Sequence, residues 1–109
     1  MTSTETVKAF VLMDKDDPGE IREIENTLEA FQEIVGGHIE TFTFSTDVTL
    51  IINEDGRLLG LPVNRDFCAH RFVGPMVFVG YDDEGEFVDL PESALEYLET
   101  WTRWLRRVK

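Results

Sequence analysis

The groups best suited to covalent chemistry in this sequence lie in one short stretch. Asp66, Cys68 and His70 alternate there and supply a carboxylate, a thiol and an imidazole, which are the groups of a nucleophilic triad. A triad works only when separate elements bring the base within hydrogen-bond distance of the nucleophile, and three side chains from one extended segment do not converge in this way. A single cysteine is also often a small buried hydrophobe. We therefore expect no catalytic residue and interpret the protein as a non-enzyme.

The acidic stretch that follows the first apolar segment comes close to a calcium-binding pattern. Asp14, Asp16, Gly19 and Glu25 nearly match the spacing of a calcium loop, but Pro18 replaces one of the ligands. A zinc site is not expected either, because one cysteine and two histidines supply too few of the ligands that zinc prefers. The sequence therefore predicts no bound metal and no cofactor.

The most unusual property of the chain is its charge. Asp and Glu total 22 against 10 Lys and Arg, which gives a formal net charge of −12. Proteins bind nucleic acid by neutralising its phosphates with Lys and Arg, so direct binding of nucleic acid is not expected. A basic protein surface is the expected partner, because opposite charge steers association. The composition also fits a salt-adapted protein of unrelated function, whose stability would keep rising above about 1 M salt.

Two groups of acidic residues are candidates for the partner surface. A helix is expected over residues 18–35, where three glutamates spaced by four residues would form one column, about 6 Å apart along the axis. Such a row loosely resembles the spacing of phosphates, which favours nucleic-acid mimicry and an anti-defence role; the alternative is a solvated polar face. The second group lies at an expected turn. The candidate partner-binding residues are Glu25, Glu29, Glu33, Asp82, Asp83 and Glu84.

A small-ligand site is the alternative function, and it would lie in the segment 62–72. This segment has no clean periodicity and is expected to be a loop or a short helical turn. Arginine can hold a phosphate or a carboxylate through two hydrogen bonds, so Asn64, Arg65 and Arg71 are candidates for binding an anionic ligand. The alternative is that these side chains pair with neighbouring acids or cap backbone groups.

The order of the expected elements favours a single α+β domain over residues 1–109. It would have a mostly antiparallel sheet of about five to six strands, with two helices packed on it. Residues 7–13 are expected to form the first strand. The first helix is expected to begin at Pro18, capped by Asp17 and Glu20, and to end at Gly36. Its expected apolar stripe is Ile21, Ile24, Leu28, Phe31 and Val35.

The middle of the chain predicts strands and one tight hairpin. Residues 38–44 are expected to form a strand, in which Ile39, Thr41 and Thr43 face one way and the residues between them face the other. Residues 48–61 are expected to form a hairpin around Asp55 and Gly56, a favoured pair for a two-residue turn. The expected cross-strand pairs are Glu54 with Arg57, Ile52 with Leu59, and Leu50 with Leu61.

The last third of the chain predicts a buried strand and a second helix. Residues 73–81 are apolar on both faces, which indicates a central strand with Pro75 at its start. A turn over residues 82–85 and a short strand follow, and a helix is expected from Pro91 onward. The expected core stripe of this helix is Ala94, Leu98, Trp101, Leu105 and Val108.

Three segments resemble an uncharacterised family of small domains found in bacteria, phages and mobile elements. They are IENTLEAFQEIVGGHIE (24–40), LIINEDGRLLGLPVNR (50–65) and FVGPMVFVGYDDEGEFVDL (72–90). The family is known only as a domain of unknown function, so the resemblance implies no activity. His38 stands where the family more often has an aromatic residue. The resemblance implies a shared motif whose glycines and proline serve turn geometry: Asn53, Gly56, Gly60, Pro62, Asn64 and Arg65.

The remaining expectations concern location and role. The single cysteine allows no internal disulfide, and no apolar run approaches the roughly 20 residues of a membrane helix. The first residues lack the features of a signal peptide. We therefore expect a cytoplasmic protein that does not bind membranes. The leading hypothesis is a non-enzymatic acidic accessory protein, carried by a phage or mobile element, that binds a basic macromolecular partner.

Overall fold

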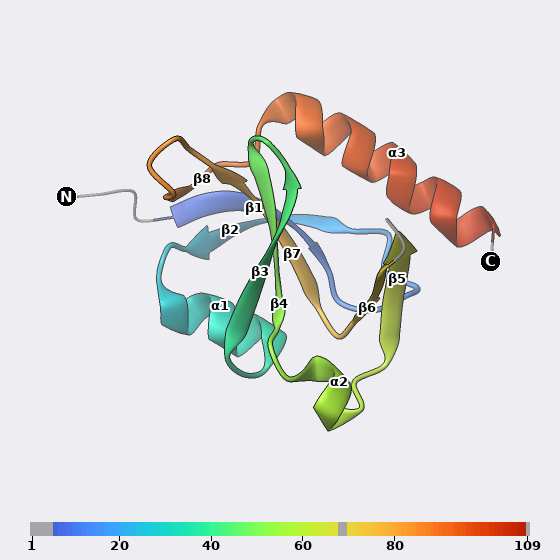
Figure 1. Ribbon diagram of the computed structural model, residues 1–109. Coiled ribbons are helices and arrows are strands. Elements are labelled where there is room, and N and C mark those ends of the chain that lie inside the picture. Colours follow the sequence, from blue (N-terminus) through green and yellow to red (C-terminus); the bar gives the residue numbers. More distant parts are fainter. Residues whose placement is uncertain (1–5, 68–69, 109) are drawn as a thin grey trace.

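An antiparallel sheet forms the centre of the protein, and helices and a separate hairpin pack around it (Figure 1). The computed structural model describes residues 6–67 and 70–108. Within these residues the main sheet has six strands and the hairpin has two, so the predicted α+β class with a mostly antiparallel sheet is confirmed. The elements in chain order are β1 (Thr6–Leu12), β2 (Glu20–Glu25), α1 (Leu28–Val35), β3 (Ile39–Ser45), β4 (Val48–Asn53), α2 (Gly56–Leu59), β5 (Val63–Phe67), β6 (His70–Val73), β7 (Met76–Tyr81), β8 (Phe87–Val88) and α3 (Glu92–Val108).

β7 is the central strand, as predicted. It pairs antiparallel with β1 on one side and with β4 on the other, and the short β8 pairs with its end. Val77, Phe78 and Val79 have no exposed surface, because both faces of the strand are covered. Pro75 precedes the strand, where its missing N–H removes no ladder hydrogen bond. The strand order β2-β1-β7-β4-β3 leaves β2 and β3 at the two edges.

Each face of the sheet carries its own hydrophobic core. Side chains alternate along a strand, so Phe10 and Phe78 belong to one core whereas Val11 and Val77 belong to the other. The first core is covered by α3 and by Phe72 of the hairpin. The second core is covered by α1. The sheet is therefore the middle layer, with α3 and α1 on opposite sides of it (Figure 1).

The residues buried by α3 and α1 can be compared with the apolar stripes predicted for the two helices. In α3, Ala94 and Leu98 are buried and Trp101 packs against the same core, as predicted. Leu105 and Val108 of the predicted stripe lie outside the side chains that the structure describes. In α1 the buried residues are Phe31 and Val35.

The predicted start of the first helix is wrong. Residues 20–25 form β2, and all six of them pair with residues of β1. The helix begins only at Leu28. Thr27 is its N-cap, and its side chain accepts a hydrogen bond from the N–H of Ala30 at 3.2 Å. The spacing of the apolar residues in the segment EIREIE fits a strand as well as a helix, so hydrophobic periodicity alone does not distinguish the two structures here. The predicted end is confirmed, since Gly36 adopts the left-handed conformation with φ of 83°.

Asp17 closes a turn instead of capping a helix. Its carboxylate accepts hydrogen bonds from the N–H of Met13 at 2.8 Å and of Gly19 at 2.9 Å. Gly19 has φ of 100°, and a Cβ at this position would overlap the ring of the buried Phe10. Only glycine satisfies both the backbone conformation and the close approach.

The hairpin predicted around Asp55 and Gly56 is also wrong. β4 already pairs with β3 on one edge and with β7 on the other, so neither edge is open to a returning strand. The chain instead enters the one-turn helix α2, where Leu58 and Leu59 are 88% and 61% exposed. The predicted pairs Glu54 with Arg57, Ile52 with Leu59, and Leu50 with Leu61 therefore do not form. The strand expected at 38–44 is confirmed as β3.

The segment 62–72, expected to be irregular, forms most of a two-stranded hairpin. β5 and β6 pair antiparallel, with Asp66 opposite Arg71. The hairpin lacks a clear apolar alternation because its strands stand apart from the main sheet, and among its described side chains Phe72 is the one that belongs to the core of that sheet. Among the residues that the structure describes, no helix is both long and apolar enough to cross a membrane.

Candidate functional site

The predicted column of glutamates on the first helix is not present. Glu25 lies on β2 opposite Thr6 of β1, whereas Glu29 and Glu33 lie on α1. The prediction failed because the helix begins after Glu25. The row of carboxylates that favoured nucleic-acid mimicry therefore loses its geometric basis.

The acids at residues 82–84 lie in the turn between β7 and β8. One carboxylate oxygen of Asp82 accepts two backbone N–H hydrogen bonds within the turn, each at 2.9 Å, so this side chain shapes the turn. Asp83 and Glu84 are exposed. The side chain of Asn26, next to Glu25, donates to the carbonyl of Phe87 at 3.2 Å. This hydrogen bond places the end of β2, and with it Glu25, beside β8, whereas Glu29 and Glu33 lie further along the chain on α1.

Asn64 and Arg65, two of the predicted anion ligands, are buried and bind the backbone of the protein itself. The amide nitrogen of Asn64 donates to the carbonyls of Leu12 at 3.0 Å and Gly74 at 2.8 Å. The guanidinium of Arg65 donates to the carbonyls of Asp14 at 3.1 Å and Asp17 at 2.8 Å. One of its nitrogens also donates to the side-chain oxygen of Asn64 at 2.9 Å. These two residues clamp the turn after β1 onto the hairpin.

Arg71, the third predicted anion ligand, is exposed and pairs with Asp66. Its Nε and Nη2 atoms donate to the two carboxylate oxygens of Asp66, each at 3.0 Å. The hydrogen bonds from Arg71 hold the pKa of Asp66 below its usual range, and the same bonds raise the pKa of Arg71. Asn64, Arg65 and Arg71 therefore do not converge on one ligand, which corrects the predicted anion site.

Two of the three residues that could do covalent chemistry, Asp66 and His70, are engaged in other contacts. Asp66 is held by Arg71, and the ring of His70 packs against Phe42. Cys68 lies outside the described residues. Within those residues, no group of three or more His, Cys, Asp or Glu side chains is placed to hold a metal ion.

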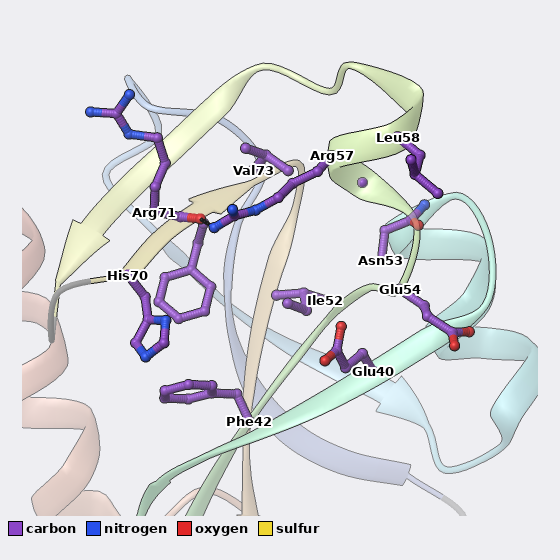
Figure 2. Close-up of a pocket in the computed structure, with 12 residues that line it drawn as sticks. Glu40, Phe42, Ile52, Asn53, Glu54, Arg57, Leu58, His70, Arg71 and Val73 are labelled. Atoms are coloured by element: carbon purple, nitrogen blue, oxygen red, sulfur yellow. Dashed lines mark hydrogen bonds between the residues drawn. The ribbon is translucent and has the colours of Figure 1, made fainter.

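A pocket of about 430 Å³ lies between the main sheet, α2 and the hairpin (Figure 2). Its volume falls in the range of roughly 300–1,000 Å³ that is usual for sites that bind small molecules or side chains. Four elements line it: β3, β4 with the turn after it, α2 and β6. The residues that line it include Glu40, Phe42, Ile52, Glu54, Arg57, His70 and Phe72.

Strand alternation and one glycine bring these side chains together. Glu40 and Phe42 are two residues apart on β3, so both point to the same face, as His70 and Phe72 do on β6. α2 approaches β6 closely at Gly56, where a Cβ would lie 2.9 Å from a methyl group of Val73. The close approach of α2 to β6 therefore favours glycine at this position.

Aromatic rings form one wall of the pocket. Phe42 meets His70 with ring centroids 5.1 Å apart and Phe72 at 5.2 Å, both edge to face. This arrangement suits the quadrupoles of the rings and leaves apolar surface directed into the cavity. An aliphatic or aromatic group of a ligand would find favourable contact here.

Charged side chains border the cavity. Arg57 extends from α2 across the pocket, and its Nη2 donates to the backbone carbonyl of Arg71 at 3.0 Å (Figure 2). Glu40 and Glu54 are exposed, and in the described part of the chain neither of them forms an ion pair. Among the described side chains, the carboxylates of Glu40 and Glu54 therefore line the cavity without an ion-pair partner.

The sequence did not reveal this pocket, because its residues are scattered over more than thirty positions and four elements. Arg71 alone among the predicted site residues lines it, and its side chain turns away toward Asp66 (Figure 2). The motif implied by the family resemblance is the sequence feature that could have located the pocket, because Asn53 and Gly56 of that motif border it.

A protein-family model described as a domain of unknown function, DUF3846, matches residues 7–102. The chain belongs to the DUF3846 family. The match spans the elements of Figure 1 from β1 to the greater part of α3. Neither a comparison with curated proteins nor one with solved structures returned a match.

Proposed function

We propose that this DUF3846 protein is a non-enzymatic accessory protein that binds a basic segment of a partner protein at the pocket. The observation that carries the proposal is the pairing of an aromatic wall, Phe42 and Phe72, with two carboxylates that lack ion-pair partners among the described residues, Glu40 and Glu54. A lysine or arginine can lay its alkyl chain on the rings and place its charge between the carboxylates.

The charge of the whole molecule supports the same partner. With a net charge of −12, the protein attracts cationic segments over distances beyond direct contact, which raises the rate of encounter. The ion pairs among the described side chains join Lys15 with Asp16, Arg22 with Glu20, and Arg71 with Asp66. Most of the carboxylates are therefore not neutralised by a paired cation and contribute to the negative potential around the protein. Carriage by a phage or mobile element would place the partner among host proteins with basic, nucleic-acid-binding surfaces.

The two alternatives have less support. An anionic ligand at 62–72 would need donors that Asn64 and Arg65 already give to backbone carbonyls. A salt-adapted protein of unrelated function accounts for the net charge but gives no role to the pocket.

Titration calorimetry with a blocked peptide of alternating lysine and threonine around one phenylalanine tests the proposal. The double variant Glu40→Gln/Glu54→Gln should bind about tenfold more weakly, a loss of about 1.4 kcal/mol. Glu29→Gln/Glu33→Gln, which removes the same charge from α1, is the matched control and should lose less than about twofold. Equal losses in both variants, or no binding at low salt, would contradict a binding site at the pocket.

A further inference from the structure

The outer edge of β3 is open. β3 ends the strand order, and within residues 6–67 and 70–108 no strand pairs with its outer side. Thr41 and Thr43 are exposed there, and the strand contains neither proline nor lysine. The opposite edge, β2, is guarded differently, because four of its six residues carry charge and its own Glu20 and Arg22 pair with each other. Such charges discourage pairing with another strand, so β3 is the edge suited to it.

The hydrogen bonds inside the sheet show which backbone groups of β3 face outward. The carbonyls of His38 and Phe42 both accept from the β4 side, the first from the N–H of Glu54 at 2.8 Å and the second from the hydroxyl of Thr49 at 3.3 Å. In an antiparallel ladder the inward and outward groups alternate by residue. The N–H and C=O groups of residues 39, 41 and 43 therefore point away from the sheet.

The side chains at this edge lead directly into the pocket. Glu40 and Phe42, which line the pocket, alternate with the residues whose backbone faces outward. In a strand added to β3, the residues opposite these two would have their Cβ atoms about 4.5–5.5 Å from those of Glu40 and Phe42, on the same face. A cationic side chain there would meet Glu40 and Glu54, and an apolar one would meet the rings of Phe42 and Phe72.

We propose that the basic segment binds in extended form, as an additional strand on the outer edge of β3, with alternate side chains directed to the pocket. This inference rests on the proposed function and specifies how the partner is held. Backbone hydrogen bonds supply the affinity of such a complex, and pockets for alternate side chains supply its specificity. The occupant is a segment of another protein and not a second copy, because a second copy would bring a further charge of −12 to the same edge.

N-methylation of the peptide separates strand addition from binding to the pocket alone. The probe is the lysine, threonine and phenylalanine peptide, measured by calorimetry on the unmodified protein. Methyl groups on the alternate amides that face β3 should weaken binding at least tenfold, because they remove the donors of the added ladder. Methyl groups on the other set of amides should change the affinity by less than about twofold.

A matched pair of variants tests the protein side. Thr41→Pro removes one outward N–H from an edge strand, a position where proline is tolerated, and should weaken binding about tenfold. Thr41→Val keeps the N–H and should bind as the parent does. Circular dichroism tests whether Thr41→Pro is folded. If it is not, the methylated peptides on the unmodified protein decide alone.

The outcomes distinguish the two proposals. Binding that depends on Glu40 and Glu54 but ignores N-methylation overturns strand addition and leaves the proposed function standing. Absence of binding by every peptide overturns both. A dimer in sedimentation that dissociates in Thr41→Pro overturns strand addition by a partner, because the edge then belongs to a second copy of this chain.

Discussion

Replacing Asn64 by leucine should destabilise the protein strongly, although the residue was first considered as a ligand-binding group. The side chain is only 4% exposed and donates to the carbonyls of Leu12 and Gly74. Asn64→Leu keeps a similar volume, loses these two hydrogen bonds and the one that the side-chain oxygen accepts from Arg65, and leaves two buried carbonyls without this donor. Each lost hydrogen bond is worth about 1 kcal/mol, and unsatisfied groups add to that, so the expected loss is about 2–4 kcal/mol. At about 4–5 °C per kcal/mol, the melting temperature should fall by roughly 8–20 °C.

Thermal and urea unfolding followed by circular dichroism measure this loss. Asn26→Leu is the matched control, because that half-buried amide makes one hydrogen bond, to the carbonyl of Phe87, and should lose about 1 kcal/mol. A double-mutant cycle with Arg65→Met should reveal coupling, since Arg65 donates to the side-chain oxygen of Asn64. If Asn64→Leu costs no more than Asn26→Leu, the clamp between the hairpin and the turn after β1 does not stabilise the fold as argued.

Two further predictions concern the turn after β1 and the hairpin. Gly19→Ala should lose about 2–4 kcal/mol in urea unfolding, since it combines a positive φ with overlap on Phe10, whereas Gly60→Ala, in open space, should lose only about 1 kcal/mol. Equal losses would refute the packing argument. For Asp66, a folded-state pKa below the unfolded value means stability that is present at neutral pH and declines as the pH falls below about 4. Asp66→Asn should remove that decline, and an unchanged acid profile would contradict the pair with Arg71.

Local signals predicted some elements well, because the deciding contacts lie close in the sequence. β7 followed from an apolar run behind Pro75, and the end of α1 followed from Gly36. The start of α1 failed because the pairing of β2 with β1 selected a strand where the sequence fitted both periods. The supposed hairpin at Asp55 failed because β7, distant in sequence, occupies the edge of β4 that a returning strand would need.

The candidate site was harder to predict than the fold. Asn64 and Arg65 were predicted to bind an anionic ligand, but their partners include backbone carbonyls about fifty residues away, which no local pattern reveals. The pocket is assembled from β3, β4, α2 and β6, and its residue types are ordinary at each place. The net charge can be counted from the sequence. The arrangement of Glu40, Phe42 and Phe72 around one cavity could not be predicted, because it depends on how strands distant in the sequence are placed.

The central position of β7 has a consequence for how the chain assembles during its synthesis. Phe78 of β7 lies opposite Phe10 of β1 and Leu50 of β4, so the middle of the sheet is made last among its long strands. Until β7 leaves the ribosome, β1 and β4 both lack the strand that pairs with their inner edges, and the apolar side chains that pack around β7 in the folded protein have no central strand to cover them. Contacts of such long sequence separation also slow folding. A nascent chain that stalls before Met76 would therefore carry two exposed apolar edges and be a substrate for chaperones or for aggregation.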